Sequence, residues 1–158
     1  MTERGTPPIW GEGVEISPPK LYELVFGFDG TGVPELAGRT QYKLTLNRLK
    51  PLELGVQFGV SVVNVPGLTL RATYRMIVSL REGSPEARDP ERAFRGVATR
   101  IAPVAMYPFI REALLSAAQR ALLPPIILPI MNVGLLWDPK EIKVPEVDSG
   151  AEQMSEGD

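Results

Sequence analysis

The feature that most constrains this chain is a long alternation of apolar and polar residues between Leu21 and Leu80. Successive side chains of a β-strand point to opposite faces, so a period of two predicts a sheet with one apolar face and one wetter face. Four strands follow from the pattern. Their apolar members are, in chain order, Tyr22, Leu24, Phe26 and Phe28; Tyr42, Leu44 and Leu46; Leu54, Val56, Phe58, Val60 and Val62; and Leu68, Leu70, Ala72, Tyr74, Met76, Val78 and Leu80.

The connections between these strands contain no helical pattern, which a parallel crossover would need. The sequence therefore predicts an antiparallel meander in which consecutive strands pair. The last connection, Val65-Pro66-Gly67, is typical of a tight turn, because proline fixes the first central position and glycine suits the second.

The period changes at Asp89, where a helix is predicted to begin. Asp89 suits the N-cap and Pro90 the first helical position, and apolar residues then recur every three or four positions up to Ile101. Pro103 is expected to end or bend this helix, and a second one is predicted from Tyr107 to about Leu123. The predicted class is α+β, with a four-stranded antiparallel sheet followed by two helices packed on one side.

The chain divides into a proline-rich arm (1–19), one domain (20–138) and a polar acidic tail (139–158) that is expected to be disordered. Beyond Pro145 there are five acids and no Lys or Arg. The whole chain has 17 basic and 19 acidic residues, so the remainder carries 17 against 14, a net charge of +3. This small excess gives no electrostatic argument for nucleic-acid binding.

The composition argues against most enzyme classes. The chain contains no Cys and no His, which removes thiol chemistry, the usual general base and the commonest metal ligands. No cofactor or metal is therefore expected. No apolar stretch is long enough for a continuous membrane span, and the N-terminus lacks the apolar core of a signal peptide, so the expected compartment is the cytoplasm.

One motif resembles an active site. The segment from Leu24 to Thr31 looks like the strand and D-x-D-G-T motif of haloacid-dehalogenase-type phosphatases, whose first Asp is the nucleophile. Gly27 stands at that position here, so no covalent intermediate can form on it. A strand that ends in an Asp29-Gly30 turn is the better interpretation.

The apolar segment 122–137 is the strongest binding signal. It is long for a small domain and has neither a helical nor an alternating stripe. It either completes the core and an interface between copies of the chain or, with the aromatic residues of the strands, lines an apolar groove. Composition does not separate these two interpretations.

Residues 102–137 resemble the helical and C-terminal part of the SecB family of protein-export chaperones. The similarity lies in Tyr107-Pro108-Phe109-Ile110-Arg111-Glu112, in Leu123-Pro124-Pro125-Ile126-Ile127-Leu128, and in Pro129-Ile130-Met131-Asn132-Val133. Tyr42-Lys43-Leu44-Thr45-Leu46 resembles the second strand of the family, and Ile77-Val78-Ser79-Leu80 resembles the end of its fourth.

The resemblance implies a SecB-like homotetramer, a dimer of dimers, that holds unfolded preproteins without ATP and keeps them competent for Sec export. It implies delivery of these clients to the SecA motor. The positions that match the apolar client groove of the family are Tyr42, Leu44, Leu46, Asn132, Val133, Leu135, Leu136 and Trp137.

The resemblance is weaker at the surface that docks SecA. Asp29, Glu152 and Glu156 could serve there, but Val25 and Arg71 stand where the family has acids, and the body is not strongly acidic. SecB-like proteins also act as chaperones dedicated to one client, such as an antitoxin of a toxin–antitoxin system. This alternative function is open to the chain.

Overall fold

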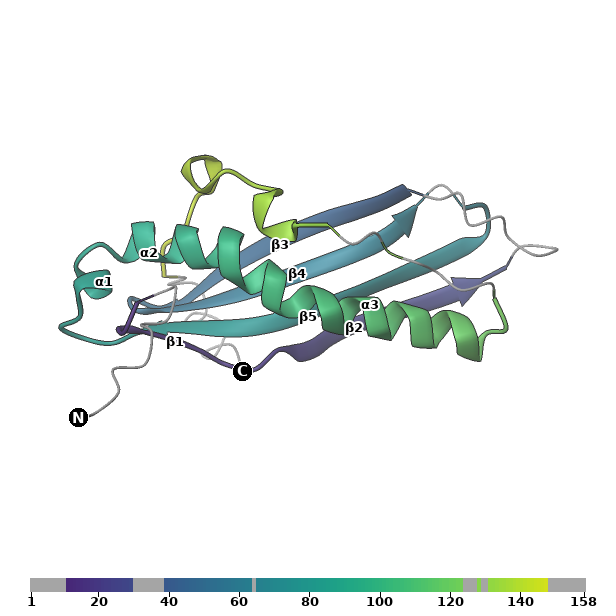
Figure 1. Cartoon of the computed structure of the whole chain (residues 1–158), viewed down its shortest axis with the longest axis horizontal. Helices are drawn as coiled ribbons and strands as arrows, with labels where there is room; N and C mark the ends of the chain where they lie inside the picture. Colours follow the sequence, from purple (N-terminus) through teal and green to yellow (C-terminus); the bar gives the residue numbers. More distant parts are fainter. Residues whose placement is uncertain (1–10, 30–38, 64, 124–127, 129–130, 148–158) are drawn as a thin grey trace, which may run out of the picture.

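The computed structural model describes residues 11–29, 39–63, 65–123, 128 and 131–147. One antiparallel sheet and a helical layer on one of its faces make up the fold (Figure 1). The strands are β1 (Val14–Ile16), β2 (Lys20–Phe28), β3 (Arg39–Lys50), β4 (Glu53–Val63) and β5 (Leu68–Leu80). The predicted α+β class is confirmed, with five strands in the described residues instead of four.

The order of the strands differs from a simple meander. β3, β4 and β5 pair consecutively as predicted, but β2 pairs with β5 and not with β3. β1 and β2 follow one another along the same edge of β5 (Figure 1). The prediction was wrong here because alternation specifies which face a residue occupies, not which strand lies beside it. Ten residues separate β2 from β3, enough for a crossing to the far edge.

The turn between β4 and β5 has the predicted form. Gly67 has a φ of +74°, and the amide of Leu68 donates to the carbonyl of Val65 at 3.1 Å. Proline followed by a residue with positive φ is the pattern of a type II turn. This turn fixes the register that places Phe58 opposite Tyr74.

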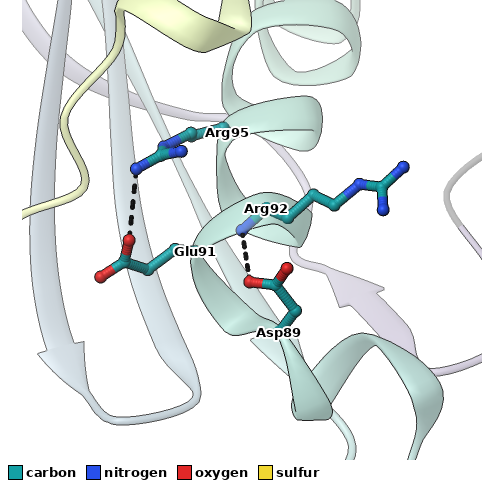
Figure 2. A network of polar contacts seen from close by, with 4 residues as sticks. All are labelled: Asp89, Glu91, Arg92 and Arg95. Atoms are coloured by element: carbon teal, nitrogen blue, oxygen red, sulfur yellow. Dashed lines mark hydrogen bonds and ion pairs between the residues drawn. The ribbon is translucent and has the colours of Figure 1, made fainter.

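The helical layer begins with α1 (Pro85–Arg88) and α2 (Pro90–Gly96). Asp89 caps α2 as predicted, accepting a hydrogen bond from the amide of Arg92 at 3.3 Å (Figure 2). One turn further on, Glu91 and Arg95 form an ion pair at 3.2 Å (Figure 2). Phe94 is buried beneath this turn and joins the core.

A π-helical turn, η1 (Val97–Ile101), leads directly into the long helix α3 (Ala102–Arg120). The helix therefore does not end at Pro103, and the second helix begins at Ala102 and not at the predicted Tyr107. Pro103 lies in the first turn of α3, where its missing amide is tolerated, and Pro108 lies inside the helix. α3 packs across β5 and β4 and buries Ile110 and Leu114, two of the predicted apolar stripe (Figure 1).

The predicted arm and tail contribute ordered structure in their described parts. β1 lies within residues 1–19, and the predicted tail begins with the 3₁₀ turn η3 (Pro139–Glu141). Val144 packs against the core, so the folded part includes residues of the predicted tail at least as far as Val144. A further 3₁₀ turn, η2 (Val133–Leu135), precedes η3.

Candidate functional site

The candidate site is built around an aromatic cluster on the helix-covered face of the sheet. We call Tyr42, Phe58, Tyr107 and Trp137 the Phe58 cluster. The ring of Phe58 stacks on Tyr42 at 6.3 Å between centroids and meets Trp137 edge-on at 5.9 Å. Tyr107 of α3 lies 6.4 Å from both Tyr42 and Phe58. Rings from β3, β4, α3 and the segment after η2 thus meet at one point.

Residues 131–137 are held to this cluster by polar contacts. The hydroxyl of Tyr42 donates to the sulfur of Met131 at 3.0 Å. The side-chain oxygen of Asn132 accepts from the amide of Gly134 at 3.1 Å, and the guanidinium of Arg100 donates to the carbonyl of Gly134 at 2.7 Å. The segment is therefore anchored to both β3 and η1.

Within residues 132–137, the predicted groove positions differ widely in exposure. Leu135 is 67% exposed and Asn132 is also exposed, whereas Leu136 and Trp137 are half-buried. Val133 is only 2% exposed and belongs to the core. The side chain of Leu135 is thus accessible to a partner, whereas Val133 is packed in the core.

On β3, the predicted residues Tyr42, Leu44 and Leu46 are half-buried against the core. We call residues 139–147 the strap. Leu44 and Leu46 share a hollow of about 410 Å³ with Ile142 and Pro145 of the strap. Of the predicted residues of β3, Tyr42 therefore belongs to the Phe58 cluster, and Leu44 and Leu46 lie against the strap.

Burial raises the pKa of the Tyr107 phenol well above its usual range, and hydrogen bonding with Tyr42 adds to this effect. Arg111, whose guanidinium lies 6.0 Å from the Tyr107 ring centre, opposes the shift. The phenol is thus neutral at physiological pH. Chemically, the site offers apolar surface, hydroxyls and backbone groups.

The described residues contain no cluster of three or more acidic side chains that could hold a metal ion. Within the same residues, no helix has the length and apolar character needed to cross a membrane.

This chain is similar to known proteins in its fold. No family model matches the sequence, and no curated protein matches it. Among solved structures, the SecB-like chaperone Rv1957 of Mycobacterium tuberculosis, in complex with a ChAD peptide from the Rv1956 HigA1 antitoxin, is similar with a TM-score of 0.59. The match covers 75% of this chain and 87% of that chain at 17% identity. The fold is SecB-like.

Of the residues predicted to dock SecA in a SecB-like protein, only Asp29 lies within the described part of the chain. It is exposed, directly after β2, and its amide donates to the carbonyl of Gly67. Glu152 and Glu156 lie outside the described residues. Val25 and Arg71 are paired on the face of the sheet that α3 does not cover.

Several residues of the site were not predicted from the sequence. Ile142 and Pro145 were assigned to the tail, although Asp138-Pro139 is a capping signal of the kind recognised at Asp89: the Asp138 side chain accepts from the amide of Lys140 at 2.9 Å. Met131 was read as part of the resemblance and not as a contact of Tyr42. No sequence signal pairs these two residues, which are 89 positions apart.

Proposed function

We propose that this chain is an ATP-independent holdase, a chaperone that binds unfolded or slowly folding polypeptides beside the Phe58 cluster. The observation that carries the proposal is the exposed apolar surface of Leu135, in a segment that the hydrogen bond from Tyr42 to Met131 joins to β3, on a SecB-like fold. A holdase stabilises the unfolded client by mass action and requires neither nucleophile nor metal. The proposal therefore makes the chain a binding protein and not an enzyme.

The proposed client surface has an exposed part and a covered part. Leu135, Met131 and Asn132 are accessible and are proposed to contact the client first. The other proposed contacts are half-buried: Tyr42, Leu44, Leu46, Leu136 and Trp137. Val133 is proposed to act from the core, by holding the segment in place. Extended clients suit such a surface because they expose apolar side chains along their length.

The strap enters the proposal because it lies against Leu44 and Leu46. A client that extends from Leu135 to Leu46 has to displace Ile142 and Pro145. Only part of the strap contributes to the core, through Val144. Client binding is therefore proposed to proceed from the exposed segment toward β3, with release of the strap as the second step.

Two client ranges are proposed. In the first, the clients are preproteins kept translocation-competent for Sec export and delivered to SecA. In the second, the chain serves one client such as an antitoxin; the antitoxin peptide bound by the similar M. tuberculosis chaperone favours this alternative. The presence of Val25 and Arg71 at the positions expected to be acidic also favours it. Either role is proposed for the cytoplasm.

We also propose a homotetramer built as a dimer of dimers, which needs two different interfaces. Two separate apolar hollows support this. One, of about 970 Å³, is lined by Ile101 and Val104 of the helical layer. The other, of about 460 Å³, lies between Phe26 of β2 and Ala117 of α3. Light scattering at micromolar concentration tests the assembly, and a mass of one subunit contradicts it.

The proposed function is tested by diluting a slowly folding precursor from denaturant in the presence of the protein, without ATP. We expect stoichiometric suppression of aggregation, and a loss of most of this protection in Leu135→Asp, because a charge on the exposed contact opposes apolar binding. Leu44→Asp is expected to act in the same direction. The same precursor in its native state serves as the control client.

The matched control variant is Leu122→Asp, which changes an apolar residue of 93% exposure outside the site. Leu122 has a φ of +57°, which aspartate tolerates. Equal suppression of aggregation by Leu135→Asp and Leu122→Asp would contradict the proposed site. The unchanged protein could also fail to protect most precursors and still protect a single antitoxin. That result would contradict the export role and support the role of a chaperone dedicated to one client. Direct binding to SecA separates the export role.

A further inference from the structure

We propose that the acidic C-terminal segment of this chain, residues 146–158, docks on the face of the sheet that α3 does not cover. We call this surface the open face. The proposal is independent of client holding, since it concerns the opposite side of the sheet from the Phe58 cluster. It rests on the shape of the open face, on its charge and on the path of the strap.

The open face is hollowed along β4. On this side β4 presents Gln57, Gly59 and Ser61, whereas β3 and β5 present longer side chains, including Lys43 and Arg71. The result is a trough of about 780 Å³. Its floor is low because Gly59 has no side chain, and the neighbouring Thr73 hydroxyl stands only 2.7 Å from where a Cβ would lie. A trough that follows a strand fits an extended peptide.

The trough and its surroundings have an excess of positive charge. Three carboxylates on the open face are already in ion pairs: Glu23 with Arg71 at 2.7 Å, Glu53 with Lys50 at 3.7 Å and Glu15 with Arg81 at 3.9 Å. Four cations of this face have no acidic partner within the described residues: Lys20, Arg39, Lys43 and Arg75.

Arg75 is one of the cations on the open face without an acidic partner among the described residues. Its guanidinium lies flat against Gly55, with Nη2 2.9 Å from the position of a Cβ there. Its Nε is buried and has no hydrogen-bond partner among the residues that the structure describes. A buried donor without a partner costs free energy, so an anionic acceptor near Arg75 would be stabilising.

The acidic segment begins close to this face. Pro145 lies beside Leu44 and Leu46, and the residues that alternate with them on β3, Lys43 and Thr45, line the trough. No main-chain hydrogen bond joins the outer edge of β3 to any other described strand. The chain after Pro145 therefore needs only to pass around this edge. Its five acids and absence of Lys and Arg match the unpaired cations.

The test uses the absence of cysteine from the chain. In the full-length protein we pair Ser155→Cys with Ser61→Cys in the trough, and separately with Gln119→Cys, at an exposed position of α3 on the helix-covered side, and follow disulfide formation in mild oxidant. We expect several-fold faster trapping at residue 61 than at residue 119. The difference should disappear at about 1 M salt, where the screening length falls to about 3 Å.

The charge variants Lys43→Gln and Arg75→Gln, combined, are expected to slow trapping at Ser61, whereas Arg92→Gln with Arg120→Gln, on exposed positions of α2 and α3, should leave it unchanged. Equal trapping at residues 61 and 119, or trapping at residue 61 that is insensitive to salt and to Lys43 and Arg75, overturns the proposal. So does a single-stranded oligonucleotide that binds the unchanged protein and abolishes trapping, because the face would then serve nucleic acid.

Discussion

The two sides of β4 differ in side-chain size and in burial. On the side toward α3, Leu54, Val56, Phe58 and Val60 are completely buried, while the other side carries Gly55, Gln57, Gly59 and Ser61 without a helical layer above them. On the first side, large side chains fill the space between sheet and helix. On the second, the missing side chains of glycine leave room for Arg75 and Thr73 of β5.

The two sides of β4 therefore contribute differently, one to stability and the other to the exposed surface. Apolar burial on the covered side supplies most of the free energy of folding, because the contribution scales with the apolar area removed from water. The open face contributes little by burial. Its sequence can therefore vary in charge and shape without loss of the fold, and a surface of this kind is suited to recognition.

The largest expected effect tests this division directly. Phe58→Ala should lower the free energy of unfolding by about 3–5 kcal/mol, because it removes a fully buried ring from the centre of the Phe58 cluster. The matched change Gln57→Ala, one residue away on the open face, should cost less than about 0.5 kcal/mol. Chemical denaturation of both variants measures the difference, and similar losses would contradict the comparison.

A second prediction concerns pH. Burial holds the pKa of Tyr107 above that of an unfolded tyrosine, so above pH 10 the unfolded state loses this proton first. The free energy of unfolding is therefore unaffected by this group below pH 10, and falls by up to about 1.4 kcal/mol per pH unit above it. Denaturation between pH 8 and pH 12 measures the slope.

Tyr107→Phe supplies the control for the pH experiment, because it keeps the ring and removes the ionisable group. The fall in stability above pH 10 should be shallower in this variant by about the contribution of one proton. An unchanged slope would mean that the hydroxyl of Tyr107 is reached by solvent in the folded protein, and that the covered side is less closed than the structure shows.

How far the sequence predicts this molecule can be argued from the same two faces. The alternation of Leu54 to Val62 correctly predicted the covered face, since periodicity encodes which side of a sheet is buried. It did not predict that β2 lies beside β5, because a crossover of ten residues permits either neighbour. The three residues of β1, between Gly13 and Ser17-Pro18, were too few to show a period.

The helical layer and the site show the same limit. Pro103 was expected to interrupt a helix, but the π-helical turn of Val97–Ile101 places it in the first turn of α3, where no amide is needed. In the site, the resemblance brought together β3 and residues 132–137. The contact of the strap with Leu44 and Leu46 was not predicted. The tail was assigned from its overall polar, acidic composition, which hides the apolar side chains of Ile142 and Val144.

The smallest expected effect is that of Gly59→Ala on the free energy of unfolding, and its sign should depend on residue 73. A Cβ added at Gly59 meets the hydroxyl of Thr73 at 2.7 Å, so Gly59→Ala should destabilise the protein by about 1 kcal/mol. In a Thr73→Ala background the nearest remaining side-chain atom, the Cβ of residue 73, is at 3.6 Å, an ordinary contact. Alanine is favoured over glycine inside a strand by about 0.5–1 kcal/mol, so the same substitution should then be stabilising. A double-mutant cycle measured by denaturation gives both values, and a loss of stability in both backgrounds would show that the floor of the trough is closed by something other than Thr73.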